Sequence, residues 1–239
     1  MAPRTLESRI DRLVICASPK ASCRSVADFA WEVAQCKQVR SPIKARLLVF
    51  RNPLRRLVSA YLNKYVEHTK YREASLRLCP QARLDTFADF VEELDRHGFR
   101  CVDRTHFHPQ IRRYRGRRFD RLFNSEDLQP LQSFVNHLFE TEVAMPFRVR
   151  PSHPGVVRDQ ASPAIAPSDP GTTTPLAHTP AAELRDLLAS GRTPGYRRFY
   201  DEILEAKARH IYRSDLRYLD HALRHRLLTP DLHQRLSAL

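Results

Sequence analysis

The sequence predicts an α/β fold in which helices flank a central parallel sheet, within a single domain over residues 1–239. Apolar runs at residues 12–18 and 46–50 are typical of buried strands, and a loop and a helical pattern follow each run. Repeated strand–loop–helix units favour a parallel sheet covered on both faces. A chain of 239 residues is long enough to bury a substantial core.

The first unit begins with RLVICAS, an apolar run rich in β-branched residues. The turn PKASCRS follows this run. Residues 25–37 then form an expected helix, because Val26, Phe29, Ala30 and Val33 recur on one helical face.

The second unit contains LLVFRNPLRRLVSAYLNKY, residues 47–65. Its strand ends in Arg51. Asn52 is a suitable N-cap, and Pro53 occupies the first helical position, where its missing N–H costs nothing. Apolar residues then recur with helical spacing as far as residue 65, which predicts an amphipathic helix.

Further elements follow at lower regularity. Helices are predicted over residues 86–96 and 126–139, and a strand over 119–124. Eight of the seventeen prolines fall within residues 146–180, which indicates a proline-rich loop or lid. One helix or a pair of helices is expected from residue 196 onward.

The charge of the chain points to an anionic partner. The formal net charge is +13 and the pI is near 10. A basic nucleic-acid-binding protein is one alternative, although the charges are spread along the chain and no zinc-finger, RNP or GxxG signature occurs. A kinase-like enzyme is another, weakened because the GxxxxGK[ST] loop is absent.

The five cysteines are odd in number and irregularly spaced, without a CxxC pair. We therefore expect neither a disulfide framework nor a structural zinc site. The same observation favours a reducing compartment. The first apolar run is too short for a signal sequence or a membrane span. We expect a soluble, cytoplasmic protein without a transmembrane segment.

Two stretches are candidates for anion binding. In ICASPKASCRS, a strand runs into a loop and a helix start, which aims backbone N–H groups at one point, and Lys20 adds a mobile charge. In the second stretch, Arg51 ends a strand at the edge where open α/β sheets bind ligands. Ser59 follows eight residues later, on a helix side shared with Arg55 and Arg56. An arginine and a hydroxyl suit a dianionic phosphate; a solvated lysine and a surface salt bridge are the alternatives.

Together, PKASCRS and FRNPLRRLVSAYLNKY resemble the two nucleotide-binding motifs of sulfotransferases that use 3′-phosphoadenosine 5′-phosphosulfate (PAPS). The longer motif is most similar to carbohydrate sulfotransferases of the chondroitin 4-sulfotransferase and HNK-1 type, called sulfotransferase family 2, and to their bacterial relatives. Near the C-terminus, AKARHIYRSDLRYL resembles their helix with a Tyr-x-x-Asp pattern. The resemblance implies a P-loop-like sheet, PAPS as sulfuryl donor, PAP as product, no required metal and a bacterial origin.

The resemblance also implies roles for individual residues. The implied donor-binding residues are Lys20, Ser22, Arg24, Ser25, Arg51 and Ser59. Lys20 and its loop would contact the 5′-phosphosulfate and stabilise charge during transfer, whereas Arg51 and Ser59 would hold the 3′-phosphate. Arg24 stands where relatives carry Thr or Ser, which leaves a non-catalytic, PAP-binding member of the family as an alternative.

The segment DRTHFHPQ, residues 103–110, resembles the His-aromatic-x-Pro-Gln element of the same enzymes. Histidine is a natural base for a sugar hydroxyl near neutral pH. His106 aligns with the family histidine and is the first candidate for a catalytic base, and His108 is the second; both are expected on an extended segment. A metal site formed with His97 and Cys101 matches no familiar zinc spacing, and a structural histidine pair is the other alternative.

These inferences predict an enzyme, a PAPS-dependent sulfotransferase that moves a sulfuryl group to a hydroxyl of a carbohydrate. Its partners would be an anionic nucleotide donor and a glycan acceptor, with no specific nucleic acid. The basic run RRYRGRR, residues 112–118, suggests an acidic or phosphorylated glycan, unless the run is a solvated loop.

Overall fold

The computed structural model describes residues 6–36, 44–146, 175–191, 194–228, 233, 234 and 237. The chain forms two compact units, the first from residues 1–53, 109–149 and 214–238, and the second from residues 54–108 and 150–213. The single domain over residues 1–239 stays a prediction. Most of the expected proline-rich loop, residues 147–174, lies outside the described residues.

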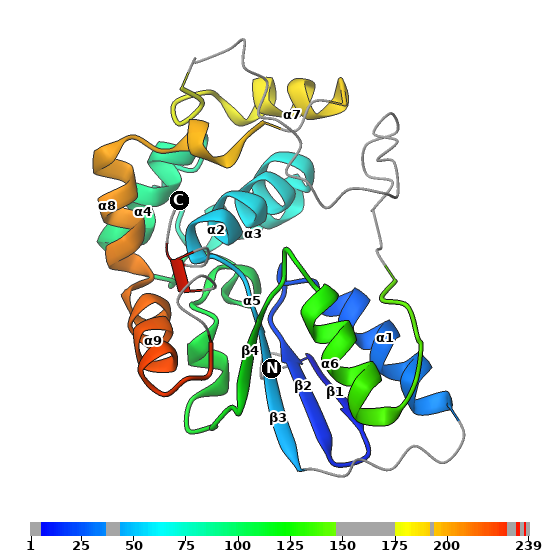
Figure 1. Ribbon diagram of the computed structural model, residues 1–239. Helices are drawn as coiled ribbons and strands as arrows, with labels where there is room; N and C mark the ends of the chain where they lie inside the picture. Colours follow the sequence, from blue (N-terminus) through cyan, green and yellow to red (C-terminus); the bar gives the residue numbers. More distant parts are fainter. Residues whose placement is uncertain are drawn as a thin grey trace. The chain divides into compact units, whose positions relative to one another are not determined.

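A four-stranded sheet forms the centre of the first unit (Figure 1). Its strands are β1 (Leu6–Ile10), β2 (Leu13–Ala17), β3 (Ala45–Phe50) and β4 (Arg121–Asn124), in that order across the sheet. β1 is antiparallel to β2, and the other two pairs are parallel. The predicted α/β class and three predicted strands are confirmed. β1 was not predicted, because LESRI is a polar edge strand without an apolar run.

Helices cover both faces of this sheet. α1 (Cys23–Gln35) and α6 (Gln129–Phe139) lie on one face (Figure 1), where Leu13, Ile15 and Leu47 pack into one core with both helices. The alternate strand residues Cys16 and Leu48 belong to a second core with α9 (Arg213–Arg224) and the 3₁₀ helix η2 (Ile111–Tyr114). The strands are apolar on both faces because helices cover both faces.

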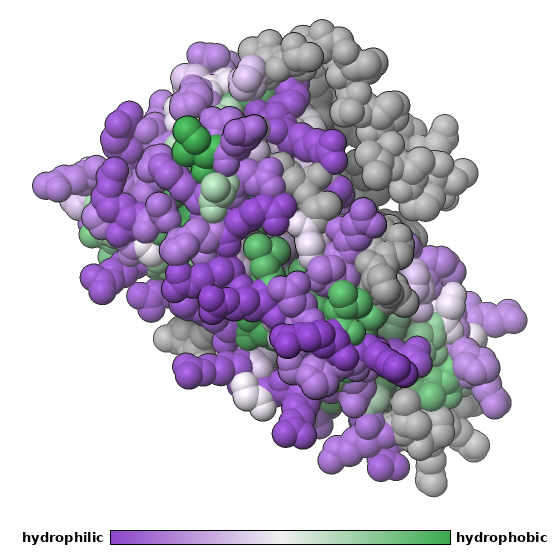
Figure 2. All heavy atoms as spheres, turned by 60° about the vertical axis from the view of Figure 1, so that its left-hand side comes forward, coloured by the Kyte–Doolittle hydropathy of each residue, from purple (hydrophilic) through white to green (hydrophobic). Residues whose placement is uncertain are grey.

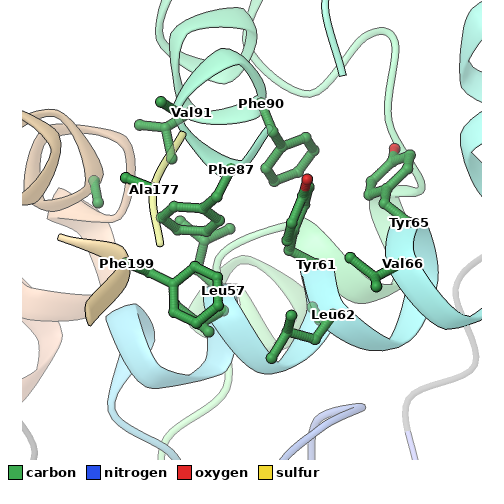
Figure 3. Close-up of a cluster of buried hydrophobic side chains, with 14 of the residues drawn as sticks. Leu57, Tyr61, Leu62, Tyr65, Val66, Phe87, Phe90, Val91, Ala177 and Phe199 are labelled. Atoms are coloured by element: carbon green, nitrogen blue, oxygen red, sulfur yellow. The ribbon is translucent and has the colours of Figure 1, made fainter. Parts of the chain in front are cut away.

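The second unit is helical. Its elements are α2 (Pro53–Tyr61), the π-helical η1 (Leu62–Glu67), α3 (Thr69–Leu78), α4 (Phe87–His97), α5 (Arg104–Phe107), α7 (Ala181–Ala189), the 3₁₀ helix η3 (Tyr196–Phe199) and α8 (Glu202–Ile211). The helix predicted to residue 65 therefore ends as a π-helix. Tyr61, Tyr65, Phe87 and Phe90 form an aromatic core, shown in Figure 3, with ring centroids 5.0 to 6.1 Å apart.

The end of the predicted proline-rich loop contributes to this core. Leu176 and Ala177 are buried, and the Ala88 amide donates to the Ala177 carbonyl at 2.8 Å. The Ala181 amide likewise donates to the Asp85 carbonyl at 2.8 Å. Two apolar residues among prolines and threonines give no periodic signal, so their burial could not be read from the sequence.

Within the described residues, a disulfide bond joins Cys79 and Cys101, and Cys16, Cys23 and Cys36 are free. No disulfide framework was expected from the sequence, and this disulfide was not predicted. Twenty-two positions separate the paired cysteines, and no local pattern identifies them as partners. Because disulfides persist mainly in oxidising compartments, the argument for a reducing compartment loses its support.

The surface of the described residues is mainly polar. Figure 2 shows one face on which hydrophilic side chains dominate and apolar residues form small separate patches. Among the described residues, the large exposed hydrophobic side chains are Trp31, Leu78 and Ile203. No helix in the described ranges is both long and apolar enough to cross a membrane.

Candidate active site

The loop between β2 and α1 adopts an unusual backbone conformation. Lys20 has φ 67° and Ser22 has φ 52°, both in the left-handed region and neither a glycine. The Ala21 amide donates to the Ser18 carbonyl at 2.9 Å, and α1 begins directly after Ser22. A left-handed conformation costs a non-glycine residue about 1–2 kcal/mol. Such strain occurs preferentially at ligand-binding sites, which agrees with the prediction of an anion-binding loop.

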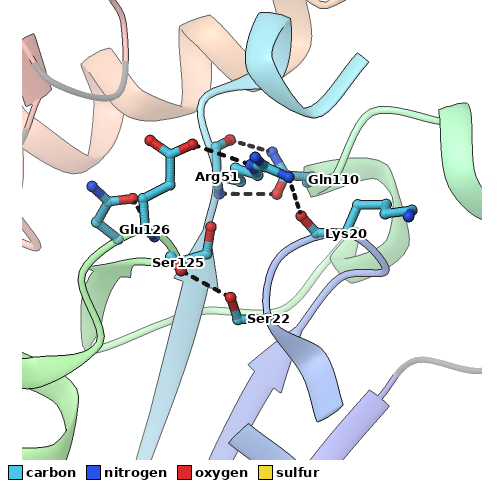
Figure 4. Close-up of polar contacts among 7 residues, drawn as sticks. Lys20, Ser22, Arg51, Gln110, Ser125 and Glu126 are labelled. Carbon is cyan, nitrogen blue, oxygen red and sulfur yellow. Dashed lines mark hydrogen bonds and ion pairs between the residues drawn. The ribbon is translucent and has the colours of Figure 1, made fainter. Parts of the chain in front are cut away.

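Arg51 connects this loop to the carboxyl ends of β3 and β4. Its Nη1 donates to the Lys20 carbonyl at 3.2 Å, and its Nε contacts Glu126 Oε1 at 3.2 Å. Figure 4 shows the Lys20 side chain extending away from the Arg51 guanidinium, while the Lys20 carbonyl faces it. The structure therefore brings Lys20 of the first motif into contact with Arg51 of the second, and both residues lie in the first unit. Glu126 was not among the predicted site residues, because the sequence around it indicates only the start of a helix.

Gln110 and Asp215 hold the Arg51 backbone in place. Gln110 Oε1 accepts from the Arg51 amide at 3.1 Å, and Gln110 Nε2 donates to the Arg51 carbonyl at 2.7 Å. The two Asp215 oxygens accept from the amides of Gln110 and Ile111, both at 2.9 Å. Gln110 and Asp215 are fully buried. Both residues belong to motifs noted in the sequence. Gln110 is the Gln of the His-aromatic-x-Pro-Gln element, and Asp215 is the Asp of the Tyr-x-x-Asp pattern. Neither was assigned a role.

The remaining predicted loop residues have different surroundings. The Ser22 hydroxyl donates to the Ser125 carbonyl at 2.8 Å (Figure 4), which ties the loop to the end of β4. Arg24 is exposed on the first turn of α1, whereas Ser25 is buried there. Their proposed contacts with a donor stay predictions.

Ser59 lies on α2, in the second unit, and is partly buried. The expected polar helix side around it differs from the structure. Arg56 is fully buried and donates to the His108 carbonyl at 3.0 Å. The Arg55 guanidinium lies 4.1 Å from the centroid of the Tyr196 ring. Both arginines therefore contact other residues of the second unit, and the role of Ser59 in phosphate binding stays a prediction.

In the second unit, His106 forms a close pair with Asp103. His106 Nδ1 lies 2.5 Å from Asp103 Oδ2, and each side chain is 18% exposed. Burial alone would raise the pKa of Asp103, but the hydrogen bond and charge of His106, with smaller contributions from the Thr105 amide and Lys64, lower it below its usual value. Asp103 is therefore an ionised acceptor at neutral pH. It was not predicted as a functional residue.

His108 has a different environment. Its ring meets the edge of Phe99, with centroids 4.7 Å apart, and it follows the end of α5. The expectation that both histidines lie on one extended segment is wrong, because Asp103 caps the short helix α5 that contains His106. The metal alternative is also wrong, since Cys101 is in a disulfide. In the part of the chain that the structure describes, no cluster of His, Cys, Asp or Glu could hold a metal ion.

His106 and Asp103 line an open cavity of about 450 Å³. Its other lining residues are Tyr71, Ala74, Ser75, Leu78, Val102 and Thr105. The Tyr65 hydroxyl lies 2.7 Å from Ser75 Oγ, next to this wall. Burial raises the pKa of Tyr65 to about 12, although the bond to Ser75 lowers it, so the neutral phenol is a poor base. His106 is the residue in the wall best suited to accept a proton near neutral pH.

Comparison with known proteins gives a family assignment. A model described as Sulfotransferase family matches residues 11–169, which is more than half of the chain. The match includes the Lys20 loop, Arg51 and the Asp103–His106 pair. Searches of curated proteins and of solved structures gave no significant match.

Proposed function

The chain belongs to the Sulfotransferase family, and from this premise we propose that it transfers a sulfuryl group from PAPS to a hydroxyl of a carbohydrate acceptor. The observation that carries the proposal is the 3.2 Å contact between the Arg51 guanidinium and the Lys20 carbonyl. This contact joins the two stretches that resemble the donor-binding motifs of PAPS-dependent enzymes. The contact supports the proposal that Lys20 and Arg51 bind the donor together, and both residues belong to the first unit.

In the proposed donor complex, Arg51 and Ser59 bind the 3′-phosphate. A guanidinium suits a dianionic phosphate because it donates several charge-assisted hydrogen bonds in a fixed geometry. Arg51 is held for this task from its backbone side by Gln110. Binding energy from this non-reacting end of the donor serves to position the sulfuryl group.

The Lys20 loop acts on the reacting end of the donor. Its ammonium and loop amides stabilise the charge that develops on the sulfuryl oxygens and on the leaving 5′-phosphate. Ser22, Arg24 and Ser25 contribute further contacts to the 5′ side. The logic is that of phosphoryl transfer, in which positioning and electrostatics account for most of the rate enhancement.

His106 is the proposed base on the acceptor side. It takes the proton of the acceptor hydroxyl as the acceptor oxygen forms its bond to sulfur in an in-line transfer. The bond between sulfur and the 5′-phosphate oxygen breaks, and PAP leaves with the electron pair of that bond. His106 is favoured over His108 because it lines the cavity together with Asp103.

The cavity beside His106 suits a sugar ring. Tyr71 and the exposed Leu78 provide apolar walls, whereas Ser75 and Thr105 provide hydroxyl groups. An apolar surface with a few polar groups is typical of small-molecule sites. An acidic glycan would agree with the net charge of +13, although Arg117 of the basic run already pairs with Glu7 of β1.

Ligand-dependent thermal stability tests the donor assignment. At about 100 times its Kd, a ligand stabilises the folded protein by about 2.7 kcal/mol. We expect 3′,5′-ADP, which carries the 3′-phosphate, to raise the melting temperature, and 5′-AMP at the same concentration to raise it little. Arg51→Ala should abolish the 3′,5′-ADP shift. The matched control Arg9→Ala, which alters an exposed arginine of β1, should retain it.

Two results would contradict the donor assignment. Equal shifts with both nucleotides, or no shift with either, would show that the 3′-phosphate is not recognised. Tight binding to random-sequence DNA that weakens steeply with salt, without a nucleotide shift, would support the nucleic-acid-binding alternative. A 3′,5′-ADP shift without turnover on any glycan tested with PAPS would support a non-catalytic member of the family.

A further inference from the structure

The two carboxylate oxygens of Asp103 make two different contacts. Oδ1 accepts from the Thr105 amide at 2.9 Å and so caps the first turn of α5. Oδ2 contacts His106 Nδ1 at 2.5 Å. One side chain therefore both starts the short helix that carries His106 and holds the ring of that histidine.

The contact determines which ring nitrogen of His106 can accept a proton. An ionised carboxylate can only accept a hydrogen bond, so the hydrogen between the two groups belongs to Nδ1. In the neutral ring, the lone pair then lies on Nε2. This tautomer makes Nε2 the nitrogen that removes a proton from an acceptor hydroxyl.

Packing around the pair limits its movement. The edge of the Tyr71 ring faces His106, with centroids 6.0 Å apart. Lys64, whose ammonium lies 4.2 Å from the Tyr71 centroid, adds a positive charge that favours the ionised form of Asp103. Phe107, the next residue, stacks on Tyr65 at 5.3 Å, and its carbonyl accepts from the buried Tyr212 hydroxyl at 2.5 Å. These contacts of His106 and Phe107 restrict the movement of α5.

We propose that Asp103 is a positioning residue that holds His106 in the tautomer and orientation needed to deprotonate the acceptor. The inference rests on the proposed function, because it assumes that His106 is the base. In this proposal Asp103 acts through His106 and takes no part in the proton transfer itself. Its negative charge also stabilises the imidazolium that forms once His106 has taken the proton.

Asp103→Asn separates the two tasks of the side chain. The amide oxygen of Asn can still accept from the Thr105 amide, so the cap persists. Its NH₂ group then faces His106 Nδ1 and donates to it, which shifts the ring hydrogen to Nε2, the wrong nitrogen for a base. We expect kcat to fall by up to about 10²–10⁴-fold, the usual contribution of a general base, with the 3′,5′-ADP thermal shift and the melting temperature unchanged.

The matched control is Asp201→Asn. Asp201 caps α8 by accepting from the Leu204 amide at 2.7 Å, so this variant makes the same chemical change at a helix start without a histidine partner. It should leave kcat within twofold of the parent. Nitrogen-15 NMR of the imidazole should show hydrogen on Nδ1 in the parent and on Nε2 in Asp103→Asn, a change that a purely structural role would not produce.

The possible failures are distinguishable. Unchanged kcat in Asp103→Asn, together with loss of turnover in His106→Ala, would overturn the role of Asp103 and leave His106 as the base. Normal turnover in His106→Ala would overturn the base assignment and the role of Asp103 with it. Hydrogen on Nε2 in the parent protein would overturn the inferred tautomer directly.

Discussion

The candidate residues of the first unit and those of the second unit are held in place in different ways. In the first unit, Arg51 and Lys20 lie where strands of a sheet end, and the buried residues Gln110 and Asp215 fix the Arg51 backbone by hydrogen bonds. In the second unit, His106 lies on a helix of four residues that follows the disulfide-bonded Cys101. The first arrangement depends on sheet topology, whereas the second depends on one cap and one cross-link.

We therefore expect that mutations can separate the proposed nucleotide binding from the proposed proton transfer. Changes in the strand-end network should affect recognition of the nucleotide. Changes around α5 should affect turnover and leave nucleotide binding intact. The predictions below test that separation, beginning with the largest expected effect.

The largest effect is expected for His106→Ala. Loss of a general base typically lowers kcat by about 10²–10⁴-fold, and the thermal shift with 3′,5′-ADP should persist because the donor site is unaltered. Steady-state turnover with PAPS measures this effect. His97→Ala, which alters a half-exposed histidine of α4, is the control. If His108→Ala abolishes turnover while His106→Ala does not, the base has been assigned to the wrong histidine.

The second-largest effect is expected when the disulfide is removed, and it concerns the stability of the fold. The cross-link spans a 22-residue separation, and a loop of that size contributes about 3 kcal/mol to stability. We expect the double variant Cys79→Ser/Cys101→Ser to lose about this much in urea unfolding, while 3′,5′-ADP still raises its melting temperature. Cys36→Ser, which removes a free cysteine, is the control.

A thiol count checks the premise of that prediction. The denatured protein should expose three free thiols before reduction, those of the three free cysteines, and five after it. Five thiols without any reductant, in protein purified from an oxidising compartment, would show that Cys79 and Cys101 do not pair.

Asp215→Asn, in the first unit, should lower the stability of the protein by a smaller amount. Asn supplies one acceptor oxygen where the carboxylate serves two buried amides, and a buried amide left without an acceptor costs about 1–3 kcal/mol. We expect unfolding stability to fall by about 2 kcal/mol and nucleotide affinity to fall with it. Asp220→Asn, which alters an exposed residue of the same helix, should change stability by less than about 0.5 kcal/mol. Equal losses in the two variants would mean that the Gln110–Asp215 contact is unimportant.

The smallest predicted effect concerns Glu126. Its carboxylate contacts Arg51 at 3.2 Å, so it would compete with the proposed 3′-phosphate for the guanidinium. Because the pair is partly exposed, its strength is modest, about 0–1 kcal/mol. Glu126→Gln should therefore tighten binding of 3′,5′-ADP by up to about fivefold in calorimetry, whereas the exposed Glu142→Gln should not. Weaker binding in Glu126→Gln would indicate that Glu126 supports the site.

The sequence predicted the elements that rest on strong local patterns. RLVICAS and LLVF are uninterrupted apolar runs, and Asn52–Pro53 marks a helix start, so β2, β3 and α2 were found. β1 and α7 were missed, because a polar edge strand and a short helix after a proline-rich segment have weak periodicity. The burial of Leu176 and Ala177 depends on tertiary packing against α4, which no local pattern records.

The candidate site was predictable to a similar extent. Lys20 and Arg51 could be predicted as candidates because their motifs are local, and the structure places the two residues in contact. Asp103 was not predicted as a site residue, because its contact with His106 depends on the turn of α5, which brings Asp103 Oδ2 to His106 Nδ1. Gln110 and Asp215 are 105 positions apart, and their pairing cannot be inferred from spacing. The disulfide was missed for the same reason.

A crystal structure of the protein with 3′,5′-ADP tests the proposed donor site most directly. We predict that the 3′-phosphate lies within hydrogen-bonding distance of the Arg51 guanidinium, and that the 5′-phosphate faces the Lys20 loop. A nucleotide bound elsewhere, with Arg51 still paired to Glu126 and no contact to the Lys20 loop, would contradict it.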